Sequence, residues 1–152
     1  MKTVLAAIDF SPVADSVIQR GIELARASKA RLVLLHVIQP PVFIASDGPA
    51  PDSSAITAAA ERSADQRLAR LETRLRREYK AVEAKRLTGI PVRLILGEAD
   101  RLKVECIVIG SHGHGAVYDL LLGGTASGIL KQATHPVVIM PPLERTPKPG
   151  TV

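Results

Sequence analysis

Two glycine-containing segments in the last third of the chain are the residues best suited to bind a ligand. The first, Gly110-Ser111-His112-Gly113, directly follows the apolar run Cys106–Ile109, and the second, Gly123-Gly124-Thr125, precedes a segment of helical periodicity. Glycine lets a ligand approach the backbone closely, and the first N–H groups of a helix carry roughly half a positive charge. A strand end and a helix start that both carry glycine therefore predict a phosphate-binding site.

The spacing of these glycines differs from the two common nucleotide-binding patterns. A P-loop needs Gly-Lys followed by Ser or Thr, and the dinucleotide fingerprint needs a third glycine at a fixed offset; neither occurs here. His112 and His114 flank Gly113, which leaves three interpretations open: a polar role near phosphate, an exposed loop, or metal ligation. Two histidines without a third ligand are weak support for a metal, so none is predicted.

Catalytic machinery is not visible in the sequence. No Ser-His-Asp set, paired carboxylates or P-loop lysine stands out, and no residue is an obvious base for activating water. We therefore predict no catalytic residue.

Length and composition indicate one globular domain. The chain has 152 residues, of which 46% are hydrophobic and 23% are charged. Aromatic residues make up 3% and Trp is absent, which removes most candidate platforms for base stacking. No run approaches the ~20 apolar residues of a membrane span, and the apolar run at the start is too short for a signal peptide. Cys106 is the single cysteine, so no internal disulfide can form, and we expect a cytoplasmic protein.

The net charge of +5 is concentrated in one segment. Nine of the 20 Lys and Arg residues lie between Arg62 and Arg86, where acidic residues are interleaved with them, and Glu72 and Arg76 are spaced as an i,i+4 pair. We interpret this segment as a solvated helix face, with a nucleic-acid or acidic-partner surface as the alternative. Neither nucleic acid nor a membrane is an expected partner.

Apolar runs and helical periodicities alternate along the chain. Strands are predicted at Val4–Ile8, Leu32–Ile38, Val92–Leu96, Glu105–Ile109 and Pro136–Met140. Helices are predicted from an N-cap at Ser11 to about Lys29, from Ile56 to about Arg86, and from Thr125 to Gln132. Residues 1–143 then form a single doubly wound α/β domain with a five-stranded, mainly parallel sheet flanked by helices, and 144–152 form a flexible tail. Any ligand is expected at the carboxyl ends of the strands.

One connection does not fit this scheme. The segment Gly97–Glu105 joins two predicted parallel strands, yet a parallel crossover usually takes about a dozen residues or more and a helix. The crossover is abbreviated, or Val92–Leu96 pairs differently, or a stretch is missing from the sequence; the residues alone leave these alternatives open.

The chain resembles the universal stress protein family over nearly its whole length. The resemblance is carried by Ile8-Asp9-Phe10-Ser11, Leu35-His36-Val37, Gly110-Ser111-His112-Gly113, Leu121-Leu122-Gly123 and His135-Pro136-Val137-Val138-Ile139. It implies a UspA-like, five-stranded domain of the adenine nucleotide alpha hydrolase type that forms a homodimer through its last strand, here Pro136 to Met140.

ATP-binding members of this family carry a G-x-x-G-x9-G-Ser/Thr signature. The resemblance implies an adenine nucleotide as cofactor, ATP or else ADP or AMP, with Mg²⁺ as a candidate companion. The residues to which it assigns contacts with adenine, ribose or phosphate are Ala7, Ile8, Asp9, Val37, Ile109, Gly110, His112, Gly113, Gly123, Gly124 and Thr125. Asp9 has an alternative role as the cap of the following turn, and His36 is interpreted as a hydrogen-bonded structural residue.

Two departures from the family pattern bear on function. Gly124 stands where the signature has Ser or Thr, although Thr125 follows it, and the short Gly97–Glu105 connection leaves the expected third helix in doubt. We expect an ATP-binding sensor or regulator of the stress response that acts on an unknown protein partner. The alternatives are a dimeric interaction module of the same family that binds no nucleotide, and a weak ATPase.

Overall fold

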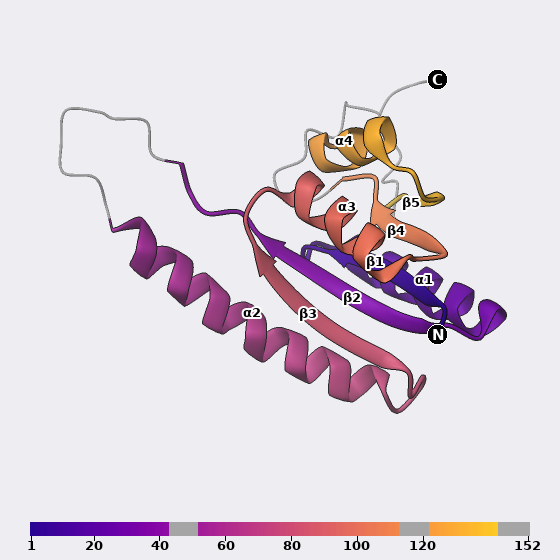
Figure 1. The fold of residues 1–152 in the computed structure, drawn as a ribbon. Helices are drawn as coiled ribbons and strands as arrows, with labels where there is room; N and C mark the ends of the chain where they lie inside the picture. Colours follow the sequence, from indigo (N-terminus) through magenta and orange to yellow (C-terminus); the bar gives the residue numbers. More distant parts are fainter. Residues whose placement is uncertain (43–51, 113–121, 143–152) are drawn as a thin grey trace, which may run out of the picture.

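Five parallel strands form one sheet whose two faces are covered by helices (Figure 1). A computed structural model describes residues 1–42, 52–112 and 122–142. The elements in chain order are β1 (Thr3–Ile8), α1 (Ala14–Ser28), β2 (Arg31–Ile38), α2 (Ser53–Leu75), β3 (Val82–Thr88), α3 (Pro91–Leu102), β4 (Cys106–Gly110), α4 (Gly124–Gln132) and β5 (Val137–Met140). The strand order β3-β2-β1-β4-β5 confirms the predicted doubly wound fold, and every strand pair is parallel.

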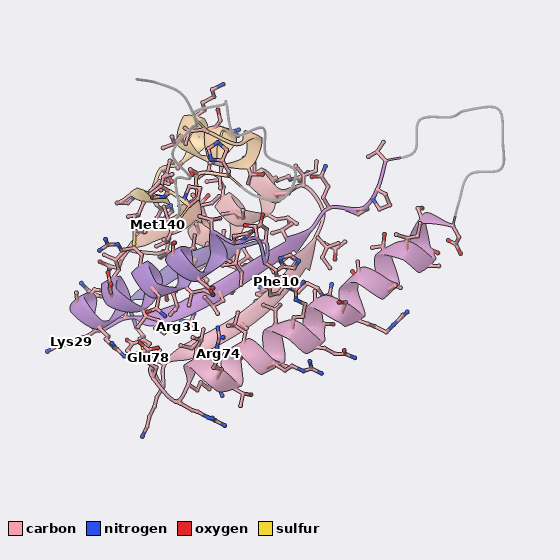
Figure 2. All side chains as sticks on the ribbon, turned by 180° about the vertical axis from the view of Figure 1, so that it is seen from behind. Phe10, Lys29, Arg31, Arg74, Glu78 and Met140 are labelled. Carbon is pink, nitrogen blue, oxygen red and sulfur yellow. The ribbon has the colours of Figure 1, made fainter. Side chains whose placement is uncertain are left out.

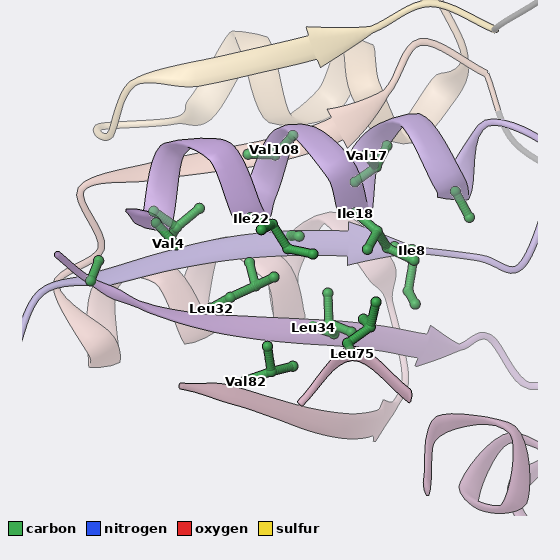
Figure 3. Packing of buried hydrophobic residues seen from close by; sticks show 14 of the residues in the cluster. Val4, Ile8, Val17, Ile18, Ile22, Leu32, Leu34, Leu75, Val82 and Val108 are labelled. Atoms are coloured by element: carbon green, nitrogen blue, oxygen red, sulfur yellow. The ribbon is translucent and has the colours of Figure 1, made fainter. Parts of the chain in front are cut away.

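The helices lie in pairs on opposite faces of the sheet. Val4 on β1 packs in one apolar cluster with Ile22 of α1 and Leu75 of α2, as Figure 3 shows. The next residue, Leu5, points to the other face and packs in a second cluster with Ile95 of α3. All six residues of β1 are buried, which explains why its sequence is a continuous apolar run rather than an alternating one.

The segment from residue 76 to residue 102 is where the predicted elements were wrong. The long helix predicted to reach Arg86 ends at Leu75, and the missing strand is β3, which pairs with β2 from Leu32↔Val82 to Ile38↔Thr88. Helical spacing continued by coincidence beyond Leu75, because Tyr79 contacts the same core cluster from a turn and Val82 joins it from a strand.

The predicted strand Val92–Leu96 lies inside helix α3. Pro91 occupies the start of this helix, where its missing N–H is not needed, and Ile95 and Ala99 are buried at helical spacing. The connection that looked too short is therefore the second half of the expected third helix. All three explanations offered for it assumed the wrong secondary structure, so the doubt over this helix is removed.

The starts of α1 and α2 differ in how they are capped. The predicted N-cap Ser11 lies outside α1; the cap position is Val13, and no side chain caps it. Helix α2 is capped by Asp52, whose carboxylate accepts hydrogen bonds from the N–H groups of Ser54 at 3.0 Å and Ala55 at 3.3 Å.

None of the helices in the described ranges combines the length and apolar character needed to cross a membrane.

Candidate functional site

Strand β1 ends before its neighbour β2, which leaves a notch at the carboxyl edge of the sheet. Its last residue, Ile8, pairs with His36, whereas β2 continues to Ile38. On the other side Ala7 pairs with Ile109, and β1 and β4 each end one residue further on, at Ile8 and Gly110. The connections turn in opposite directions on the two sides of β1, and doubly wound sheets bind ligands at such a switch point.

The notch forms a crevice of about 840 Å³, within the range of ~300–1,000 Å³ typical of small-molecule sites. Its walls come from both faces of the sheet. The lining residues are Ala7, Ile8, Asp9, Phe10, Val13, Ala14, Val17, Leu35, His36, Val37, Ile38, Gln39, Ala60, Ser63, Ala64, Arg67, Pro91, Ile95, Ile109, Gly110, Ser111, His112, Gly123, Gly124, Thr125 and Ala126.

One part of the crevice is an apolar slot formed by β2, β4 and α3. Leu35, Ile95 and Ile109 are buried in the same core cluster, and Val37 packs against it. Val37 pairs with Leu87 of β3 but lies beyond the last residue of β2 that pairs with β1. Val37 therefore lies where β2 extends past the end of β1, and it contributes to the lining of the crevice there.

The N-terminus of α4 contributes backbone donors to the same crevice. Ser127 is the first residue of this helix whose N–H reaches back along the chain, to the Gly123 carbonyl at 2.9 Å. The N–H groups of Gly124, Thr125 and Ala126 precede it and have no partner within the helix. The Gly123 N–H donates to the Ser111 carbonyl at 2.6 Å, so the two glycine segments are joined by a hydrogen bond.

The two signature glycines Gly110 and Gly124 differ in how much space surrounds them. A Cβ on Gly110 would lie 2.5 Å from Cγ1 of Val13 and 3.1 Å from the His112 carbonyl oxygen, so only glycine fits between β4 and α1. A Cβ on Gly124 would meet no atom of the described residues within 4 Å. A serine or threonine therefore fits at position 124, and the fold does not require glycine there.

Asp9 and Phe10 form the turn that leaves β1. The Asp9 carboxylate accepts a hydrogen bond from the Ser11 N–H at 3.0 Å, which is the turn-capping role considered as its alternative. Asp9 also lines the crevice, so the two roles are compatible. Phe10 has φ = 61°, a left-handed conformation that is rare for a residue other than glycine.

A stack of three side chains forms the wall of the crevice next to α2. The rings of Phe10 and His36 lie 4.6 Å apart between centroids, and the Arg67 guanidinium carbon lies 4.0 Å from the Phe10 centroid. Figure 2 shows Phe10 between α1 and α2. Such cation–π contacts contribute about 0.5–2 kcal/mol, depending on exposure.

His36 is held in its neutral form by its surroundings. Burial lowers the pKa of His36; the Ile8 carbonyl and Asp9 oppose this effect, and Arg67 and Arg86 add to it. Its Nδ1 lies 2.8 Å from the Ile8 carbonyl oxygen, so a neutral ring donates its Nδ1 proton there. The interpretation of His36 as a hydrogen-bonded residue is confirmed, although its ring also lines the crevice.

The structure brings together the site residues predicted from the sequence. Ten of them line the crevice, namely Ala7, Ile8, Asp9, Val37, Ile109, Gly110, His112, Gly123, Gly124 and Thr125. Gly113 and His114 lie outside the described residues. The main omissions were Phe10 and the α2 residues Ala60, Ser63, Ala64 and Arg67, whose three- and four-residue spacing marks one helix face.

Other residues considered as functional have structural surroundings. The Cys106 thiol is buried, and burial raises its pKa, so it acts as a small apolar residue. Arg76 and Glu72 form the expected i,i+4 ion pair at 2.5 Å. Among the described residues no group of three or more His, Cys, Asp or Glu side chains is placed to hold a metal ion.

Comparison with known proteins identifies the family. The model of the universal stress protein family matches residues 1–141. The chain belongs to the universal stress protein family. It is 33% identical to the universal stress protein A homolog 1 of Coxiella burnetii, over 90% of this chain and 94% of that protein. It is also 33% identical to a universal stress protein of Mycobacterium tuberculosis, over 92% of this chain but only 48% of that relative, about half its length.

Solved structures of the family share the fold. A family member from Burkholderia pseudomallei superimposes with a TM-score of 0.72 at 23% identity, over 91% of this chain and 94% of that one. The universal stress protein from Archaeoglobus fulgidus in complex with dAMP gives 0.64 at 24% identity, with 92% and 97% coverage. A universal stress protein in complex with cAMP gives 0.56 at 22% identity, with 91% and 94% coverage.

Proposed function

We propose that this universal stress protein binds an adenine nucleotide in the crevice and acts as a sensor or regulator of the stress response. One observation carries the proposal: an apolar slot and the free N–H groups of a helix N-terminus line the same cavity. The apolar slot suits a purine, and the N–H groups of the helix N-terminus suit a phosphate. The dAMP and cAMP bound by two structural neighbours support the same ligand class.

The residues of the crevice divide this task between them. The N–H groups of Gly124 and Thr125, with the Thr125 hydroxyl, would donate to phosphate oxygens at the positive end of α4. The backbone edge of Val37 would hydrogen-bond the base beside the apolar slot. Asp9, already fixed by the Ser11 N–H, would accept from a ribose hydroxyl.

ATP, alone or with Mg²⁺, is the nucleotide we propose as the physiological ligand. A triphosphate offers the α4 N-terminus more charge than the single phosphate of dAMP, and favourable charge at a helix N-terminus contributes about 0.3–1 kcal/mol at an exposed site. The nucleotide would supply the regulatory state rather than a chemical step.

We also propose that the protein forms a homodimer through β5. This strand lies at one end of the sheet order, and all four of its residues are partly exposed. An unpaired strand edge is a template for pairing with a second copy. Light scattering on the purified protein tests this assembly; a mass equal to one chain at micromolar concentration would reject it.

The decisive experiment measures nucleotide affinity with a variant that reverses the charge at the α4 N-terminus. Gly124→Asp places a carboxylate where phosphate is expected, and the open space around Gly124 accommodates it. Gly97→Asp is the matched control, because a Cβ on Gly97 also meets no atom and this residue does not line the crevice. We expect millimolar ATP with Mg²⁺ to raise the melting temperature of wild type and of the control, but not of Gly124→Asp.

Mass spectrometry of denatured protein adds a readout that needs no added ligand. An adenine nucleotide released from wild type and absent from Gly124→Asp supports the proposal. If wild type carries none and shows no thermal shift with ATP, ADP or AMP, the family's interaction-module alternative is correct for this chain.

A further inference from the structure

A second cavity, next to the crevice, lies between the start of α1 and the C-terminal third of α2. It has a volume of about 520 Å³, and we call it the arginine groove. Its lining residues are Ile8, Phe10, Ser11, Pro12, Ala14, Asp15, Ile18, Arg67, Arg70, Leu71 and Arg74. Both helices cover the same face of the sheet, so the groove opens on that face (Figure 2 labels Phe10 and Arg74).

Three arginines form one wall of the arginine groove. Arg67, Arg70 and Arg74 recur at three- and four-residue steps on one side of α2, so their Cα atoms span about 10 Å along the helix axis. None of the three forms an ion pair with a carboxylate of the described residues. Arg76 and Arg86, by contrast, are paired with Glu72 and Asp65 at 2.5 and 2.8 Å.

The remaining surfaces of the groove are apolar or carry an unused hydrogen-bonding group. Pro12, at the start of α1, and Leu71, on α2, supply aliphatic surface beside the guanidinium groups. The Ser11 hydroxyl, on a residue that is only 6% exposed, has no hydrogen-bond partner among the described residues. Buried hydroxyls are normally satisfied, so this group keeps an unused hydrogen bond beside the groove, as does Ser16 elsewhere on α1.

Charge and shape together define the occupant. Asp15 is the one carboxylate of the lining, so the groove carries excess positive charge facing an apolar floor. A bare polyphosphate would leave Pro12 and Leu71 without a partner, and a nucleic acid would find no free aromatic face, because Phe10 is covered by Arg67 and His36. An extended peptide places alternate side chains about 6.5 Å apart, close to the step of about 6 Å from Arg70 to Arg74 along the helix.

We propose that the arginine groove docks a segment of a partner protein that carries two or three carboxylates around one apolar side chain. The carboxylates pair with Arg67, Arg70 and Arg74, because charge-assisted hydrogen bonds to guanidinium are strong and geometrically specific. The apolar side chain covers Pro12 and Leu71. The groove shares Arg67 with the crevice, but Arg70 and Arg74 do not line the crevice, so peptide docking does not require a bound nucleotide.

The test is a selection that makes no assumption about the partner's sequence. Random dodecapeptides displayed on phage are selected on the immobilised full chain, with counter-selection on the double variant Arg70→Glu/Arg74→Glu. We expect enrichment of acidic peptides that contain a bulky apolar residue. Synthetic versions should bind at least about tenfold more weakly to the double variant, with affinity that falls as salt is raised.

A matched double variant controls for net charge. Arg62→Glu/Arg77→Glu changes the charge by the same amount at exposed residues that do not line the groove, and it should bind the peptides like wild type. If the Glu pair does not fold, as judged by thermal melting, Arg70→Gln/Arg74→Gln replaces it and should still weaken binding several-fold.

Three results would overturn the proposal. The selected peptides show no acidic bias; or they bind the groove variant as well as wild type; or the control variant loses as much affinity as the groove variant. A fourth outcome assigns the groove to another ligand class: oligo(dT) or inorganic polyphosphate binds wild type and not the groove variant, while no peptide is selected. If the wild-type protein binds the selected peptides but no adenine nucleotide, the proposed function is rejected and the groove proposal stands.

Discussion

Restoring the signature hydroxyl in Gly124→Ser tests the proposed nucleotide site most directly. Position 124 is the first residue of α4, and no described atom lies within 4 Å of a Cβ built there. Serine therefore fits without moving the backbone and brings a hydroxyl to the N–H groups that face the crevice. We expect ATP to bind more tightly to this variant than to wild type.

The expected gain follows from the hydrogen bond that serine adds. A hydrogen bond to a charged group contributes about 1.5–3 kcal/mol, and ordering a side chain on binding costs about 0.5 kcal/mol or more. At about 1.4 kcal/mol for each factor of ten, the affinity should rise roughly tenfold. Isothermal titration calorimetry with ATP and Mg²⁺ measures it, and Gly97→Ser controls for the general effect of replacing a helical glycine, because its Cβ is equally unobstructed.

Thr125 decides how a null result is interpreted. If its hydroxyl already binds phosphate, Thr125→Ala should weaken ATP binding roughly tenfold, and Gly124→Ser should restore the loss in the double variant. The reasoning is refuted if Gly124→Ser gains nothing, Thr125→Ala loses nothing, and both proteins melt at the wild-type temperature. Hydroxyl groups at the α4 N-terminus would then contribute nothing to nucleotide binding.

Three further predictions concern the fold and the wall between the two cavities. The Arg101 guanidinium lowers the pKa of the Glu98 carboxyl and burial raises it, and the net effect lowers this pKa from 4.5 to about 2. Glu98→Gln should therefore reduce the free energy of unfolding by about 3 kcal/mol at pH 7, as measured by denaturant unfolding. Because the folded pKa is the lower one, this stability is present above pH 4.5, and the difference between the proteins should vanish as the pH falls towards 2. Gly110→Ala should destabilise by about 1–3 kcal/mol, since its Cβ would overlap Val13, and an unchanged melting temperature would contradict this close approach. Arg67 lines both cavities, so saturating ATP should change the affinity for groove-selected peptides, and the peptide should change the affinity for ATP by the same factor. Arg67→Gln should abolish this coupling. Independent binding of ATP and peptide to the wild-type protein would refute the prediction.

The sequence predicted the centre of the fold better than its edge. Strands β1, β2 and β4 are largely buried, and each contains a run of apolar residues, followed in β2 by His36, that only a covered strand tolerates. Strand β3 lies at the edge of the sheet, and its residues, including Lys85 and Arg86, are mostly partly exposed. Because β3 has no continuous run of apolar residues, the sequence pattern assigned its residues to the preceding helix.

The sequence predicted the site residues whose position depends on the sheet topology, but not those whose position depends on how a helix is rotated about its axis. Asp9 directly follows β1 and Gly110 is the last residue of β4, so their position at the carboxyl edge follows from the topology alone. Which face of α2 meets the crevice depends on the rotation of that helix about its axis, which its many arginines do not define. Arg67 was therefore interpreted as part of a solvated face, although it contacts Phe10.

Phe10 connects the two cavities to the shape of the sheet. Because β1 stops at Ile8, the chain must turn away beside the switch point, and Phe10 does so with φ = 61°. A left-handed conformation costs a residue other than glycine about 1–2 kcal/mol, and glycine would avoid that cost. The aromatic ring instead fills the space between His36 and Arg67 and lines both the crevice and the arginine groove. The ring is therefore part of the wall of both cavities, so a ligand that moves it in one cavity must alter the lining of the other.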